Sequence, residues 1–178
     1  MKDFIIELFA NYKTEIVFLH VISAVIWVGG MVAMRYASHQ SFLNIQDPKL
    51  RLNTISYALK RLFSIVSPFV IILITTAVIM AVGLGFRTAA VDSSGNVIDE
   101  YAMYIYNLVH VKEVIWMVMA TNLTAMIIRR NQAQKLLDND DVKGAKAKLE
   151  LIGKYMVPVN IALGVCAIFL GVYLRNAY

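Results

Sequence analysis

Four long stretches of apolar residues, separated by polar segments, run along the 178-residue chain. They cover about residues 15–35, 62–86, 104–128 and 155–174. Each is close to the roughly 20 apolar residues that an α-helix needs to cross the hydrocarbon core of a bilayer. The third stretch reaches that length only if it extends back from residue 114 through His110. The pattern predicts an all-α protein, a four-helix transmembrane bundle that residues 1–178 form as a single integral membrane domain.

The polar segments predict shorter elements. Residues 1–13 carry mixed charges and no signal-cleavage site, so we expect an amphipathic helix that lies on the interface or leads into the first span. Asp47 and Pro48 mark a turn before a helix that leads into the second span, which Pro68 begins or kinks. Residues 88–103 are expected to form a loop. Asp141 is a candidate N-cap for a short surface helix that reaches Ile152.

Composition and charge narrow the class of protein. Hydrophobic residues make up 59% of the chain and charged residues 16%, against about 25% charged in soluble domains. The net charge is +5, and most lysines and arginines fall within residues 35–61 and 129–154. Because short cytoplasmic loops collect such residues, both segments are predicted inside and both termini outside. Membrane lipid is therefore the expected partner of the basic residues, and nucleic acid is not.

Two histidines within the apolar stretches are the main candidates for chemistry. His20 and His110 each lie about five residues into a span, and both spans are predicted to run from outside to inside, so the two rings share a depth. On neighbouring helices such a pair can provide both axial ligands of a haem b iron. Trp27 lies on the His20 face and would line the haem. Arg35 and Lys112 would hold its propionates.

The same positions allow other interpretations. His20 and His110 would also suit structural hydrogen bonds between helices, and Lys112 would also suit snorkelling towards headgroups. His39 lies near the opposite interface, where it is interpreted as a solvated residue. Glu113 either pairs with a lysine or passes a proton, and its spacing does not distinguish the two roles.

Copper and self-association are further hypotheses. Cu(I) favours thioether ligands, and six methionines lie in or beside the spans: Met31, Met34, Met80, Met117, Met119 and Met126. Met117 and Met119 are two apart on a helix and point to different faces, and Cys166 is interpreted as a small apolar residue, so copper ranks second to haem. Gly164 and Gly171 lie on one face of the fourth span and permit close helix contact, either within the bundle or in a homo-oligomer.

Several short motifs resemble those of a bacterial membrane superfamily. The segment from Leu19 to Gly30, followed by Arg35 and His39, resembles the first helix of the superfamily that contains HemJ-type protoporphyrinogen IX oxidases and copper-resistance D (CopD-like) proteins. Further similar motifs begin the other three helices: Arg61-Leu62-Phe63 with Pro68, His110-Val111-Lys112, and Pro158. The resemblance covers most of residues 14–174.

The resemblance implies a membrane oxidoreductase in the bacterial inner membrane, with both termini periplasmic. HemJ-like proteins bind haem b through a histidine that matches His20, have basic residues that match Arg35 and Lys112, and pass electrons from protoporphyrinogen IX to a respiratory-chain acceptor such as a quinone. CopD-like proteins instead are linked to copper movement, without haem, and their tryptophan-glycine-glycine motif matches Trp27 to Gly30. This chain lacks the histidine usual deeper in the third helix, around Thr121 and Asn122.

Overall fold

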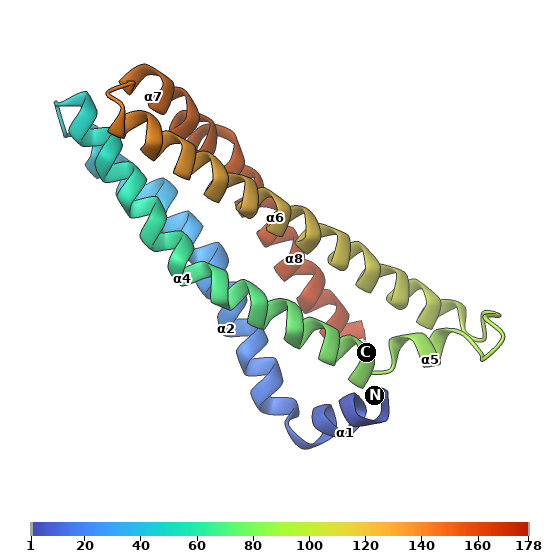
Figure 1. Ribbon diagram of the computed structural model, residues 1–178. Helices are drawn as coiled ribbons and strands as arrows, with labels where there is room; N and C mark the ends of the chain where they lie inside the picture. Colours follow the sequence, from blue (N-terminus) through green and yellow to red (C-terminus); the bar gives the residue numbers. More distant parts are fainter. Residues whose placement is uncertain (1, 178) are drawn as a thin grey trace.

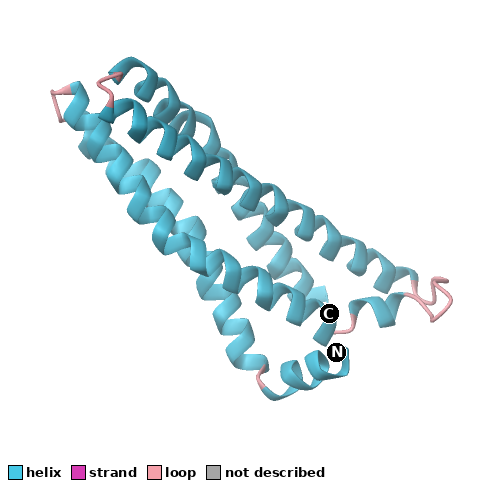
Figure 2. Ribbon diagram, in the orientation of Figure 1, coloured by secondary structure: helices cyan, strands magenta, loops and turns pink. Residues whose placement is uncertain are grey.

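The computed structural model describes residues 2–177, and within this range it consists of helices joined by short turns (Figure 2). One isolated antiparallel β-bridge joins Val91 and Val97. In chain order the elements are α1 (Lys2–Asn11), α2 (Lys13–Val32), the π-helix η1 (Ala33–Ser38), α3 (His39–Leu43), α4 (Pro48–Gly83), α5 (Phe86–Ala90), α6 (Glu100–Asp138), α7 (Val142–Leu151), the π-helix η2 (Ile152–Met156) and α8 (Val157–Ala177). The all-α prediction is confirmed.

Four helical runs are long and apolar enough to cross a membrane, namely Lys13–Leu43, Pro48–Ala90, Glu100–Asp138 and Val142–Ala177. Each contains one of the predicted spans and continues beyond it. Their outward surfaces are apolar: the side chains of Phe18, Ile71 and Phe169 are 63%, 66% and 68% exposed. Because a soluble domain does not expose apolar surface on this scale, the chain has the surface of a multi-pass membrane protein.

The four long helices form a bundle in which α2 and α6 lie on diagonal corners. The helix α2 packs along α4 and α8, and α6 packs along the same two helices (Figure 1). Within the described residues no comparable contact joins α2 to α6. The expectation that these two helices are neighbours is therefore wrong, and only side chains that reach across the interior can join them.

The two ends of the bundle differ. Both chain ends, α1, α5 and the 91–99 loop lie at one end, which we call the N/C end, and the turns 44–47 and 139–141 with α7 lie at the other, the hairpin end (Figure 1). The helix α1 packs against α4: a Cβ atom added at Gly83 would lie 2.4 Å from the Phe9 ring. The N-terminal helix is thus part of the bundle's contacts.

Side-chain caps begin the helices at the hairpin end. The Asp47 carboxylate accepts hydrogen bonds from the backbone N–H groups of Lys49 and Leu50, at 2.8 and 3.1 Å, and Pro48 occupies the first turn, where its missing N–H costs nothing. Asp141 likewise accepts from Gly144 N–H at 2.8 Å. The predicted cap at Asp141 is confirmed, and Asp47, predicted to mark a turn before a helix, is the N-cap of α4. Pro68, by contrast, lies in the interior of α4 and does not begin it.

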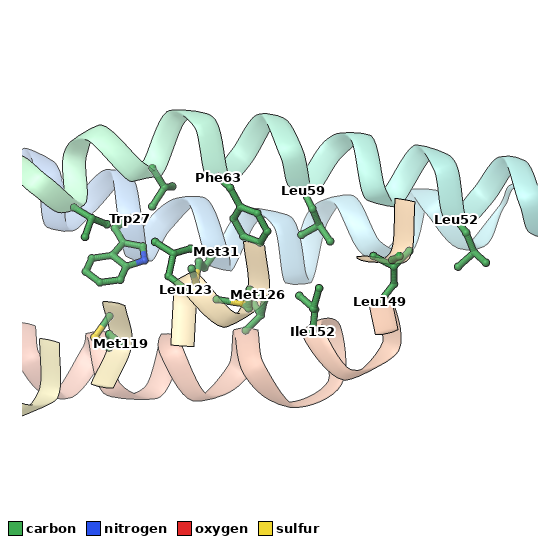
Figure 3. Close-up of a cluster of buried hydrophobic side chains, with 14 of the residues drawn as sticks. Trp27, Met31, Leu52, Leu59, Phe63, Met119, Leu123, Met126, Leu149 and Ile152 are labelled. Atoms are coloured by element: carbon green, nitrogen blue, oxygen red, sulfur yellow. The ribbon is translucent and has the colours of Figure 1, made fainter. Parts of the chain in front are cut away.

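The apolar core extends from the middle of the bundle to the hairpin end. In Figure 3 the side chains of Trp27, Met31 and Phe63 point into the space between the helices, together with Met126 and Ile152. The core includes Ala145 and Leu149 of α7, so the predicted surface helix in fact packs into the bundle. Two small residues of α8 allow it to approach α2 and α6 closely.

Gly164 and Gly171 are those two residues, and both serve contacts within the chain. A Cβ atom at Gly164 would lie 2.6 Å from Val28 of α2, and one at Gly171 would lie 3.1 Å from the Lys112 ammonium of α6. The stripe that suggested self-association is therefore already used inside the bundle, and it gives no support to a homo-oligomer.

Candidate functional site

His20 lies on α2 with its ring held against α4. Its Nδ1 atom is 3.0 Å from the Thr76 hydroxyl oxygen, and Thr76 is buried. The Thr76 hydroxyl lies 2.8 Å from the Ile72 carbonyl, to which it donates its single proton, so its oxygen is left to accept a proton from Nδ1. This arrangement assigns the proton to Nδ1. In this tautomer Nε2 carries a lone pair, as in a metal-binding imidazole whose other nitrogen is oriented by a partner. The Leu73 carbonyl is a further hydrogen-bond acceptor for the ring.

Lys112 reaches the same part of the bundle from the diagonal helix α6. Its ammonium lies over Gly171 of α8, and its charge acts on the His20 ring. His20 and Lys112 therefore lie at a common depth, in the half of the bundle nearer the N/C end. Among residues 2–177 the Lys112 side chain makes no hydrogen bond or ion pair. A cation in a membrane span without a carboxylate is costly, and an anionic ligand would offset that cost.

His110 faces away from this pair. Its Nδ1 atom lies 2.8 Å from the Glu113 carboxylate, and its side chain is half exposed; the ring also contacts Tyr106 edge-on, with centroids 4.4 Å apart. Residues two apart on an α-helix are rotated by about 200° about its axis, so His110 and Lys112 lie on opposite faces of α6. The structure thus does not bring His20 and His110 together. The Glu113 carboxylate is paired with His110 and not with a lysine.

Trp27 lies on the face of α2 that carries His20, seven residues further along. Its side chain is 1% exposed, and its indole nitrogen is the one buried side-chain polar atom of the described residues that has no hydrogen-bond partner. Ser23, between the two, is also buried and donates to the Leu19 carbonyl at 2.6 Å. A buried donor without an acceptor costs about 1–3 kcal/mol. The indole N–H is thus positioned to donate to an acceptor atom of a ligand.

Arg35 lies far from these groups. It is 15 residues beyond His20 on a continuous helical run, which corresponds to about 20 Å along the axis. It lines a groove at the hairpin end together with His39. The predicted site residues therefore divide into three places: His20, Trp27 and Lys112 share the bundle interior, Arg35 lies at the groove, and His110 lies on the surface. One cofactor cannot contact all of them.

Three polar positions important in the interior were missed by the sequence analysis. Thr76 orients His20. Asn160 of α8 is buried, accepts a hydrogen bond from Asn122 at 2.7 Å and donates to the Met119 carbonyl at 3.2 Å. Arg130 is buried and its Nε–H donates to the Ser56 carbonyl of α4 at 2.9 Å. Each lies on the buried face of its helix, so helical periodicity applied to polar residues carried a usable signal.

Metal-binding side chains do not gather elsewhere. Within residues 2–177 no group of three or more His, Cys, Asp or Glu residues lies close enough to hold a metal ion. Cys166 is exposed on α8, and the sulfur atoms of Met31, Met119 and Met126 belong to the packed core. Of the three histidines, His20 is the one that hydrogen-bonds a side chain of a neighbouring long helix.

Comparisons with protein-family models, with curated proteins and with solved structures found no match to this chain. The resemblance to the HemJ and CopD superfamily accordingly rests on the motif residues quoted above.

Proposed function

We propose that this chain binds haem b at the His20 site and serves as a redox protein of the bacterial inner membrane, in electron transfer or in tetrapyrrole oxidation. The observation that supports it most is the geometry of His20: the bond to Thr76 leaves a lone pair on Nε2, inside a membrane bundle, beside a lysine that lacks an anionic partner. These are the two groups that a cofactor with a metal centre and carboxylate substituents requires.

Each residue of the site would hold a different part of the haem. His20 Nε2 would hold the haem iron, and Thr76 would fix the ring and its tautomer as the outer partner. Lys112 would bind one propionate, and the Trp27 indole would donate to an acceptor atom of the ligand. Haem, when bound, supplies one-electron chemistry. The proposal departs from the paired-histidine expectation because His110 points elsewhere, so the chain provides one histidine ligand from this pair.

The charge pattern supports an orientation with both termini outside, in the periplasm. The hairpin end carries the basic residues of the two connecting segments, including Lys143, Lys146 and Lys148 of α7, and such residues accumulate on the cytoplasmic side. The His20 site then lies in the outer half of the membrane. An electron acceptor that reaches it, such as a quinone or another respiratory-chain component, would do so through the bilayer.

The absorption spectrum of the purified protein tests the proposal. Protein purified in a mild detergent, or reconstituted with haem, is expected to show a Soret band that His20→Ala removes. His110→Ala is the matched control and should leave the spectrum unchanged. Thr76→Val should lower haem affinity by about 10- to 100-fold, the usual cost of losing the outer partner of a ligand. A protein that shows no Soret band even after reconstitution would overturn the proposal, and copper found without haem would favour copper transport.

Lys112 is tested by two variants, one that removes its charge and one that keeps it. Lys112→Gln should weaken haem binding without changing the shape of the spectrum, because the iron keeps its ligand, and Lys112→Arg should restore much of the affinity. If neither variant changes haem binding, the propionate role is wrong while the His20 assignment stands.

A further inference from the structure

A groove opens at the hairpin end of the bundle, bounded by η1 and α3, by the first turns of α4, and by α7 with η2. Its volume is about 620 Å³, within the range of roughly 300–1,000 Å³ that is usual for sites that bind small molecules. Apolar side chains form the floor, among them Leu52, Leu59 and Ile152, which also belong to the core seen in Figure 3. The groove therefore connects the apolar interior to the end of the spans.

The charges around this floor are almost all positive. Four cations and one carboxylate line the groove: Arg35, Arg51, Lys146, Lys154 and Glu150. The ion pairs found among residues 2–177 involve none of the four cations. The groove thus offers an apolar bed beside several uncompensated positive charges, and the two properties together fit an amphiphile with an anionic head.

Both π-helical segments of the chain border this groove. The segment η1 contributes Arg35 and η2 contributes Lys154 with Gly153. A π-turn is a rare and less favourable backbone geometry that occurs frequently at functional sites. A Cβ atom added at Gly153 would meet nothing within 4 Å, so η2 presents open space at the groove. Two such segments facing one groove are an observation independent of its charge.

We propose that this groove binds an anionic phospholipid of the surrounding bilayer, with the acyl chains on the apolar floor and the phosphate among the cations. The groove lies at the ends of the apolar spans, where lipid headgroups are found, and basic pockets between transmembrane helices are known to hold anionic headgroups. A zwitterionic lipid would bind more weakly there, because its own positive charge would be repelled by the four cations. About 20 Å separates Arg35 of this site from His20, measured along the continuous run of α2 and η1.

Lipid titration of the full-length protein tests this inference. The protein is washed free of co-purified lipid in a mild detergent, and its thermal unfolding midpoint is followed while phosphatidylglycerol is added to the micelles. Phosphatidylcholine with the same acyl chains and inorganic phosphate are the parallel additions. We expect a saturable rise of the midpoint with phosphatidylglycerol, and no such rise with the other two.

Matched variants locate the effect in the groove. Each cation contributes about fivefold to lipid affinity, so the double variant Arg35→Gln with Lys154→Gln should bind about 25-fold more weakly. The control, Lys13→Gln with Arg175→Gln, removes two exposed cations at the N/C end. Gly153→Leu should block the groove, whereas Gly29→Leu, at a second open helical glycine, should not. Glu150→Gln removes the one carboxylate and should tighten lipid binding. A gain in affinity cannot result from a damaged fold.

Three results would overturn the inference. Equal stabilisation by phosphatidylglycerol and phosphatidylcholine would mean that the charges do not select the ligand. A full response to inorganic phosphate would mean a site for a free anion. A Soret band that is lost in His39→Ala and retained in His20→Ala would make the groove the haem site and would reject both assignments.

Discussion

The interior site and the groove use positive charge in opposite ways. In the interior, Lys112 and His20 are surrounded by apolar helices, and the Lys112 ammonium is the one charge there, without an ion-pair partner among the described residues. In the groove, four cations stand at the ends of the spans, and each remains close to water or headgroups. A single basic residue in the interior therefore restricts the ligand to one with an anionic group. In the groove each basic residue adds a separate, smaller contribution to ligand affinity. Variants that probe matched positions in the two regions test this view.

Packing gives the largest expected contrast. Gly164→Leu should lower the free energy of unfolding by about 3 kcal/mol, because even a Cβ atom there would lie 2.6 Å from Val28 and overpacking carries costs on this scale. Gly153→Leu should leave stability unchanged or raise it by less than about 1 kcal/mol, through better helix propensity. Detergent unfolding followed by circular dichroism measures both. Equal losses would mean that the groove is closed in solution.

Removal of charge gives the next contrast. Lys112→Met should raise the free energy of unfolding of the haem-free protein by about 2 kcal/mol, since an unpaired cation within a span is costly. Arg35→Met at the groove should change it by no more than about 0.5 kcal/mol. The same unfolding titration measures both variants. A loss of stability in Lys112→Met would show that the ammonium has a stabilising partner, contrary to the site described above.

The amide pair between α6 and α8 should have a smaller effect. Asn160→Leu removes the bond to Asn122 and the bond to the Met119 carbonyl, and hydrogen bonds between membrane helices contribute about 1 kcal/mol. Asn176→Leu, at an exposed position of the same helix, is the control. If the two variants behave alike, the Asn122–Asn160 contact does not hold the helices in the bundle.

The exposed ion pair between the two hairpin turns should contribute least. The Lys49 ammonium, which hydrogen-bonds and attracts the Asp140 carboxylate, lowers the pKa of Asp140 from its ordinary value. A lowered folded-state pKa gives stability that is present above the unfolded value of about 3.9 and is lost as the pH falls through the folded value. Asp140→Asn keeps a residue tolerated at the positive φ of 63°.

The test is the pH dependence of that variant. The unfolding midpoints of the wild type and Asp140→Asn should differ slightly at neutral pH and low salt. The difference should shrink as the pH falls below about 4, vanish below the lowered folded-state pKa of Asp140, and be small at high salt. A gap that persists in acid would assign the effect to backbone conformation instead of charge.

The fold was largely predictable because its signals are local. A run of apolar residues long enough to span a bilayer identifies each long helix, and an aspartate before a helical turn identifies the caps at Asp47 and Asp141. The common depth of His20 and the start of the third span also follows from counting residues. Counting residues could not give the direction in which each side chain points from its helix. The Lys112 ammonium lies over Gly171 of α8, whereas His110, two residues earlier, pairs with Glu113 on the opposite face.

The sequence by itself determined that the chain forms four apolar helices and where along them the ionisable residues lie, because length, hydropathy and caps act within one segment. Only the tertiary structure decided that α2 and α6 are diagonal, that Thr76 orients His20, and that Arg35 belongs to a separate groove. These facts depend on how each helix is rotated about its axis. That rotation is set by the packing of all four helices together, through contacts such as Gly164 against Val28, and no single segment encodes it.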